Sequence, residues 1–151
     1  MKLMGIARRK ASRAVMEELQ FVNVSPEKGV EGDFRGKPGK RQVTVLSLDA
    51  WTDACQEVGE SLPWTIRRAN LLVEGTRFSQ ANVGDVIQIG QLRLKVTRET
   101  DPCPRMDEQF QGMTQALKPD WRGGVCCTVL SGGTIQVGDT VRIESGNAVQ
   151  E

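Results

Sequence analysis

The sequence contains no histidine. Without an imidazole, a Ser-His-Asp triad and a Cys-His catalytic pair are both excluded. Cysteine is also sparse: Cys55, Cys103, Cys126 and Cys127 form no C-x-x-C pair, and the last two are adjacent. We expect no zinc site, because a structural zinc ion would need all four thiolates at a spacing that this chain does not offer.

Long apolar runs and aromatic residues are scarce as well. No stretch approaches the ~18 apolar residues that a membrane span needs, and residues 1–5 lack the apolar core of a signal peptide. We therefore expect a cytoplasmic protein with no membrane partner. Aromatic residues make up 5% of the chain and the net charge is +1, so nucleic acid is not an expected partner: few bases would find a ring to stack on.

What is present is typical of one globular domain. The chain has 151 residues, of which 38% are apolar and 26% charged, enough to bury a real core. We assign residues 1–145 to a single domain and residues 146–151 to a flexible tail. Residues 1–41 carry ten Lys or Arg against five Asp or Glu, whereas residues 42–151 carry ten against fourteen. This basic first third is either a solvated face or a site for a phosphate or another anion.

Short β-branched and apolar stretches between turn residues predict an all-β class with one or two short helices. A turn at Gly90-Gln91 joins two of the strands as a hairpin. So many strands in one domain favour a closed or nearly closed β-barrel, which removes exposed edges. The predicted strands cover residues 41–46, 70–73, 86–89, 92–98, 125–130, 134–136 and 140–144.

Two helices are predicted. The first covers residues 49–58, with Ser47 or Asp49 as its N-cap and Gly59 at its end. Cys55 falls on its apolar face and is expected to pack there. The second covers residues 107–117, with Pro119 beyond its end.

Cys103 is the candidate for chemistry. It lies between Pro102 and Pro104, directly after a predicted strand, and prolines fix their own φ and push the preceding residues toward extended conformations. A cysteine held in this way is displayed on a stiff loop. Arg105 and the start of the second helix lie close in sequence, and positive potential from both favours a thiolate. The alternative is a surface cysteine with no task.

The order of the motifs resembles the MOSC domain, a family named after the C-terminal domain of molybdenum cofactor sulfurases. The resemblance runs from about residue 5 to residue 145. It rests on Gly29-Val30-Glu31-Gly32-Asp33, Arg41-Gln42-Val43, Arg67-Arg68-Ala69-Asn70-Leu71, Val83-Gly84-Asp85, Cys103 after a strand, and Val137-Gly138-Asp139.

The resemblance implies a β-barrel like the pyruvate kinase barrel domain, binding of the anionic molybdopterin cofactor, and a cysteine that carries sulfur as a persulfide or ligates molybdenum. By matching motif, Cys103 takes the cysteine role, as catalytic residue and as molybdenum ligand. Arg68 and Asn70 take the Arg-x-Asn role near the cofactor, with Arg41 and Arg35 as further cofactor-binding candidates. Read as a strand, this segment would point Arg68 and Asn70 into the same cavity as Cys103, and Arg67 away from it.

The sequence also departs from the family pattern. Many relatives carry a histidine shortly after the Gly-Asp motif, whereas here Asp33 is followed by Phe34. Pyridoxal phosphate is not expected, because no desulfurase domain is present. Three functions stay open: a cofactor-handling sulfur carrier, a molybdenum-dependent reductase of N-hydroxylated bases or amidoximes, and a non-catalytic barrel that binds an anion or a protein. The partners implied are a molybdoenzyme and a cysteine desulfurase or electron-donor protein.

Overall fold

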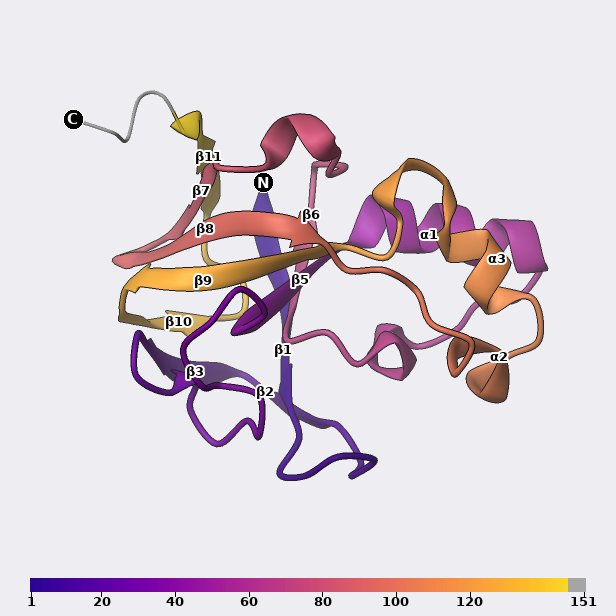
Figure 1. The fold of residues 1–151 in the computed structure, drawn as a ribbon, viewed down its shortest axis with the longest axis horizontal. Helices are drawn as coiled ribbons and strands as arrows, with labels where there is room; N and C mark the ends of the chain where they lie inside the picture. Colours follow the sequence, from indigo (N-terminus) through magenta and orange to yellow (C-terminus); the bar gives the residue numbers. More distant parts are fainter. Residues whose placement is uncertain (147–151) are drawn as a thin grey trace.

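Two β-sheets form the body of the molecule in the computed structural model, which describes residues 1–146 (Figure 1). The larger sheet has the strand order β11 (Val141–Glu144), β7 (Val86–Ile89), β8 (Leu92–Glu99), β9 (Val125–Ser131), β5 (Val43–Ser47), β6 (Leu71–Glu74), β1 (Lys2–Arg8) and β2 (Glu17–Leu19). The smaller sheet has the order β10 (Gly133–Gln136), β3 (Phe21–Ser25) and β4 (Gly29–Val30).

The predicted class, mainly β with few helices, is confirmed, but the sheets are not closed into a barrel. Within residues 1–146, no ladder joins β2 at one edge of the larger sheet to β11 at the other. The start of β1 comes closest to closing this gap. Its Leu3 donates to Asp139 O at 2.9 Å and accepts from Gly138 N at 2.7 Å, and Val141 N donates to Met1 O at 2.9 Å.

A single parallel pair, β5 with β6, interrupts the antiparallel pairing of the larger sheet. Parallel neighbours need a crossover connection, and helix α1 (Leu48–Val58) and the 3-10 helix η1 (Trp64–Arg67) provide it. The first predicted helix is therefore correct: the Ser47 hydroxyl accepts Ala50 N as its N-cap, and Gly59 ends it at φ 75°.

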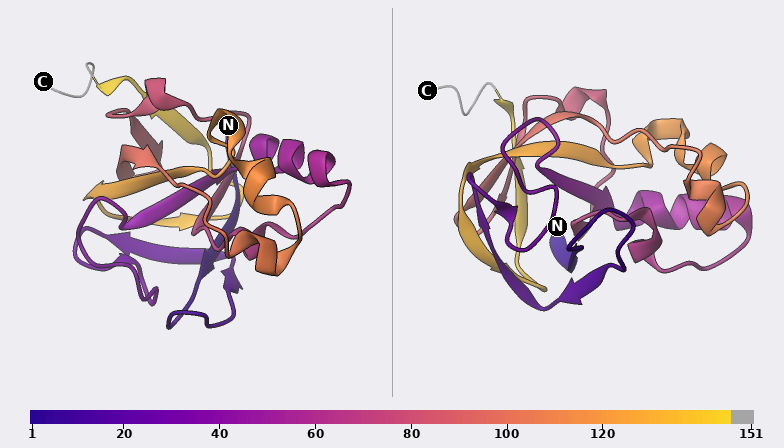
Figure 2. Two further views of the ribbon diagram at one scale, coloured as in Figure 1. Left: turned by 45° about the vertical axis from the view of Figure 1, so that its right-hand side comes forward. Right: turned by 60° about the horizontal axis from the view of Figure 1, so that its bottom comes forward.

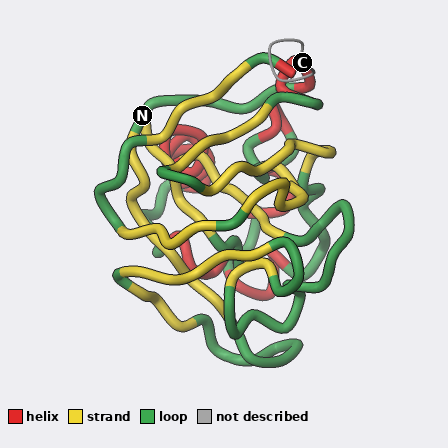
Figure 3. Tube along the Cα trace, turned by 90° about the vertical axis from the view of Figure 1, so that its left-hand side faces the viewer, coloured by secondary structure: helices red, strands yellow, loops and turns green. Residues whose placement is uncertain are grey.

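Alternating side chains of these strands face two separate cores. On β6, Leu71 and Val73 pack into the core between the sheets, whereas Leu72 packs against the helices. The second core also holds Trp51 and Leu117. The helices accordingly extend from one end of the β body in Figure 1. In Figure 3, most of the helical segments lie behind the strands.

The second predicted helix is wrong as a continuous element. Two short helices, α2 (Met106–Gln109) and α3 (Met113–Leu117), occupy its place. Phe110 is extended at φ −161°, and Gly112 has φ 91°, a left-handed value that interrupts a right-handed helix. The 3-10 helix η3 (Pro119–Trp121) follows α3, and η2 (Gln80–Asn82) precedes β7.

Within the described residues, no helix is both long enough and apolar enough to cross a membrane. Most of the predicted flexible tail lies outside those residues. Of residues 146–151, the structure describes Gly146, whose N–H donates to the Asp85 carboxylate at 3.1 Å.

Candidate functional site

A cavity of about 380 Å³ opens where the helices meet the β body. Its walls come from the loop after β1, the loop between β4 and β5, the turn after η1, and the segment between β8 and α2. Both views of Figure 2 show the helices on one side of the β body. Seven arginines line it, against two carboxylates, Asp101 and Glu108. The arginines are Arg9, Arg13, Arg35, Arg41, Arg67, Arg68 and Arg105.

Cys103 lines the same cavity and is exposed, whereas Cys55, Cys126 and Cys127 are buried. Its carbonyl holds the loop in place: it accepts the Thr114 hydroxyl at 3.1 Å and Met106 N at 2.9 Å. The Cys103 backbone is therefore tied to both short helices while its side chain stays accessible. The sequence prediction of a displayed thiol agrees with this geometry.

Phe34 and Asp33 fix the outer wall. The Arg9 guanidinium lies 4.7 Å from the centre of the Phe34 ring and that of Arg35 lies 5.1 Å from it, distances at which cation–π attraction operates. The Asp33 carboxylate accepts Arg9 N at 3.0 Å and Arg35 N at 3.3 Å. One aromatic ring thus lies within cation–π distance of two cavity arginines.

The arginines of this outer wall lie close enough together to repel one another. Burial lowers the pKa of Arg9 to about 10, and the neighbouring guanidinium groups of Arg68, Arg35 and Arg41 add to the effect. The pKa of Arg68 is lowered as well, first by burial and then by Arg13. A bound anion would relieve the repulsion, so the electrostatics favour a negatively charged ligand.

The sequence-predicted residues separate into two groups. Cys103, Arg35, Arg41 and Arg68 all line the cavity. Asn70 does not: it is buried beneath the cavity, where its side-chain oxygen accepts Thr44 N at 3.0 Å and its Nδ2 donates to Ala7 O at 3.2 Å. Asn70 therefore joins β5 to β1 and supports the site from behind.

The expectation that Arg67 points away from the cavity is wrong. The backbone there is not a strand: Arg67 ends η1, and Arg68 has a left-handed φ of 64°. Both side chains therefore reach the cavity. Sequence reasoning missed Arg67, Arg9 and Arg13 as cavity residues, whereas it named Arg105 for its charge near Cys103. The excess of basic residues before position 42 was the signal for Arg9 and Arg13.

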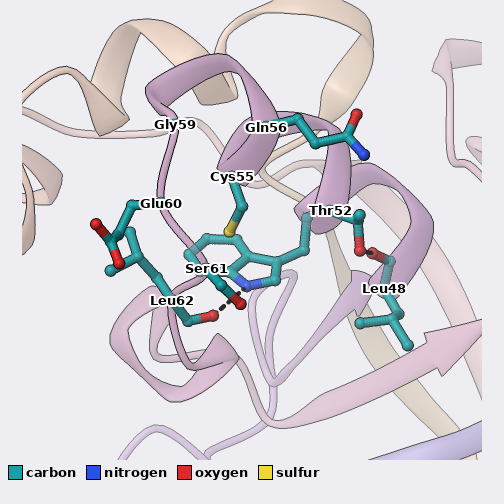
Figure 4. Close-up of a pocket in the computed structure, with 9 residues that line it drawn as sticks. Leu48, Thr52, Cys55, Gln56, Gly59, Glu60, Ser61 and Leu62 are labelled. Atoms are coloured by element: carbon teal, nitrogen blue, oxygen red, sulfur yellow. Dashed lines mark hydrogen bonds between the residues drawn. The ribbon is translucent and has the colours of Figure 1, made fainter.

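A second cavity, of about 390 Å³, lies between α1 and residues 59–62 (Figure 4). Cys55 points from α1 toward the segment that carries Ser61 and Leu62. Glu60 is the one charged residue of its lining. Without a cluster of charge, this cavity lacks the features of an anion site.

The donor set of the first cavity suits an anionic group better than a bare metal ion. Within residues 1–146, no three Cys, Asp or Glu side chains lie close enough together to hold a metal. Seven arginines provide the hydrogen-bonding forks that phosphate oxygens accept, and one accessible thiol lies among them. The residues therefore fit a phosphate-bearing cofactor that brings its own metal.

The fold and this cavity define a class: a small β domain with an arginine-lined pocket beside an exposed cysteine. The family model of the MOSC domain matches residues 27–142. The chain belongs to the MOSC domain family.

Solved structures share the fold. The YuaD protein from Bacillus subtilis superposes with a TM-score of 0.83 at 18% identity, over 95% of each chain. YiiM from Escherichia coli superposes with a TM-score of 0.70 at 16% identity, over 96% of this chain and 70% of its own. YiiM from Geobacillus stearothermophilus superposes with a TM-score of 0.69 at 15% identity, over 94% of this chain and 72% of its own. Among curated protein sequences, the comparison found no match.

Proposed function

We propose that this protein binds the molybdenum cofactor in the arginine-lined cavity and uses Cys103 to carry sulfur or to ligate the metal. Family membership supports an association with the molybdenum cofactor in general. The observation that carries the proposal is that one cavity combines seven arginines with the exposed thiol.

The arginines supply binding and orientation. Arg35 and Arg41 are exposed at the rim, and Arg9 and Arg68 are half-buried behind them. Guanidinium groups bind phosphate oxygens in a two-pronged manner, which holds the ligand in one orientation. Asn70 is a positioning residue, since its hydrogen bonds fix the strands behind Arg68.

Cys103 supplies the chemistry on the protein's side. When bound, the cofactor provides a thiophilic molybdenum centre, for which a thiolate is a suitable soft ligand. An accessible thiolate is equally the group that can carry sulfur as a persulfide. If Cys103 carries sulfur, a cysteine desulfurase would be the partner that loads it. If the bound cofactor turns over a substrate, the partner would be an electron-donor protein.

The test is expression in a host that makes the cofactor, followed by metal analysis and a persulfide assay on the native protein. We expect the wild type to retain molybdenum, labile sulfur, or both. Cys103→Ser should lose all labile sulfur, and lose molybdenum too if the thiolate is a ligand. Cys55→Ala is the matched control and should behave as the wild type, because Cys55 lies outside the arginine-lined cavity. A wild type with neither molybdenum nor labile sulfur would refute the proposal.

A further inference from the structure

Arg67 differs from the other cavity arginines in its burial. It is 8% exposed. Its Nε donates to Gly123 O at 3.1 Å and its Nη2 to Thr100 O at 3.0 Å, which fixes the plane of the guanidinium. Its Nη1 has a weak contact, to the Met106 sulfur at 4.0 Å. The group is thus held rigidly by neutral partners, with part of its donor capacity left over.

No carboxylate among the described residues forms an ion pair with Arg67, although Asp101 and Glu99 lie near enough to interact with its charge. Among residues 1–146 there are three ion pairs, Arg8–Glu17, Arg77–Asp53 and Arg122–Glu57, and Arg67 is in none of them. Burial, and then the nearby Arg41, lowers the pKa of Arg67 to about 10, so the side chain remains charged at neutral pH. A buried cation without an anion is costly to fold.

The position of Arg67 relative to Cys103 indicates where an anion would lie. Both residues line the cavity, and among the interactions that raise the pKa of Arg67 the one with Cys103 is the largest, ahead of those with Cys126 and Asp101. These effects are smaller than those of burial and Arg41. The inner end of the cavity therefore has a buried guanidinium without an ion-pair partner near the thiol.

Arg68 cannot serve this inner position in the same way. Its Nη2 donates to Ala14 O, which holds the side chain toward the loop after β1. The charged groups that act on its pKa and on that of Arg9 belong to this outer wall. The cavity thus has two regions of positive charge, an outer one around Arg9 and Arg68 and an inner one at Arg67, with Arg41 acting on both Arg9 and Arg67.

We propose that Arg67, assisted by Arg41, forms an inner subsite for a tetrahedral oxyanion beside Cys103, separate from the outer arginine wall. The ligand class is a group such as phosphate, sulfate or molybdate, free or as the anionic end of a larger ligand. This inference rests on the proposed function in taking the cavity as the binding site, and it adds which arginine presents an anionic group to the thiol.

The experiment measures how fast iodoacetamide alkylates Cys103 in the native protein at increasing inorganic phosphate. We expect phosphate to slow alkylation of the wild type. In Arg67→Gln the half-protecting concentration should rise about tenfold or more, as loss of a charge-assisted hydrogen bond implies. Arg68→Gln should change it less, and Arg77→Gln should leave it unchanged, because Arg77 does not line the cavity and pairs with Asp53.

Equal protection in Arg67→Gln and the wild type, or no protection of the wild type, would overturn the subsite. If Arg67→Gln does not fold, Arg67→Lys replaces it: the charge remains but the fork is lost, and protection should weaken several-fold, whereas unchanged protection would again overturn the subsite. Molybdenum and labile sulfur on the wild-type protein test the proposed function separately, so the two can fail independently. Phosphate and molybdate compared in the same assay distinguish the possible sources of the anion.

Discussion

Gly123 supports the cavity by having no side chain. A Cβ at this position would lie 2.4 Å from Thr100 O and 3.1 Å from Arg67 Nη2. Both atoms belong to the hydrogen bond that holds the Arg67 guanidinium. The close approach of three chain segments at this point therefore depends on one residue, and the geometry of Arg67 depends on that approach.

We predict that Gly123→Ala destabilises the protein by about 2 kcal/mol, the usual scale for forcing one carbon into a packed site. It should also weaken phosphate protection of Cys103, because Arg67 must move. Gly138→Ala is the control: it has φ 100° and open space around its Cβ, so about 1 kcal/mol of backbone strain is expected with normal protection. Urea unfolding and the alkylation assay measure the two effects. Normal protection in Gly123→Ala would contradict the link to Arg67.

Arg67 and Arg68 show where residue-level reasoning from sequence fails. Alternation of side chains between two faces holds in an extended strand. The chain turns here instead, and the left-handed φ of Arg68 brings both side chains to one cavity. Cys103 was predictable because its prolines constrain the backbone locally, whereas the fate of Asn70 depends on Thr44 and Ala7, which are distant in sequence.

At the scale of elements, one buried glutamine pins the loop that carries Arg35 and Arg41. Gln42 is 1% exposed. Its Nε2 donates to Pro26 O at 2.7 Å and to Gly36 O at 3.0 Å, and its Oε1 accepts Val129 N at 2.9 Å. A single side chain thus ties Gly36 of the loop to the turn between β3 and β4 and to β9.

We expect Gln42→Ala to cost about 3 kcal/mol, because it removes two buried hydrogen bonds and one partly buried one from backbone groups. The loop should loosen, and the cavity should bind phosphate less tightly. Gln88→Ala provides the comparison: its side chain makes one exposed contact, to Gly90 O, and its loss should stay within about 0.5 kcal/mol. Denaturant unfolding monitored by tryptophan fluorescence would show the difference. Similar losses for the two variants would mean that the buried network does not hold the loop.

The regular elements were largely predictable because their signals are local. The strands at β7, β8 and β9 and the helix α1 have periodic apolar residues and glycines at their ends. Strands β1 to β4 were not predicted. They lie in the basic third of the chain, where short apolar runs are interrupted by charges, and their pairing with β6 and β10 decides their conformation. The helix predicted for residues 107–117 failed at Gly112 for a local reason that the sequence did contain.

At the scale of the whole molecule, solvent can reach one of the four cysteines and not the other three. Cys103 is exposed; Cys55, Cys126 and Cys127 are buried. Burial, and then the adjacent Cys126, raises the pKa of the Cys127 thiol, which keeps it protonated and unreactive.

We therefore predict that a thiol reagent labels one cysteine quickly in the native protein and four after denaturation. Intact-mass measurement over time gives the count. Cys103→Ser should abolish the fast phase and leave three thiols that react at the rate of unfolding or local opening. A fast phase that survives in Cys103→Ser would show that the second core or the β9 strand opens more readily than its burial implies.

The hydrogen bonds between residues 1–3 and residues 138–141 have a consequence for biosynthesis. Strand β1 can find β2 and β6 while the chain is still short, but the hydrogen bonds of Met1 and Leu3 to residues 138–141 cannot form until residue 141 has left the ribosome. Pairing over such a sequence distance is slow, and unpaired apolar strands are prone to aggregate. Until then the nascent chain exposes an unfinished sheet edge, which a chaperone can recognise.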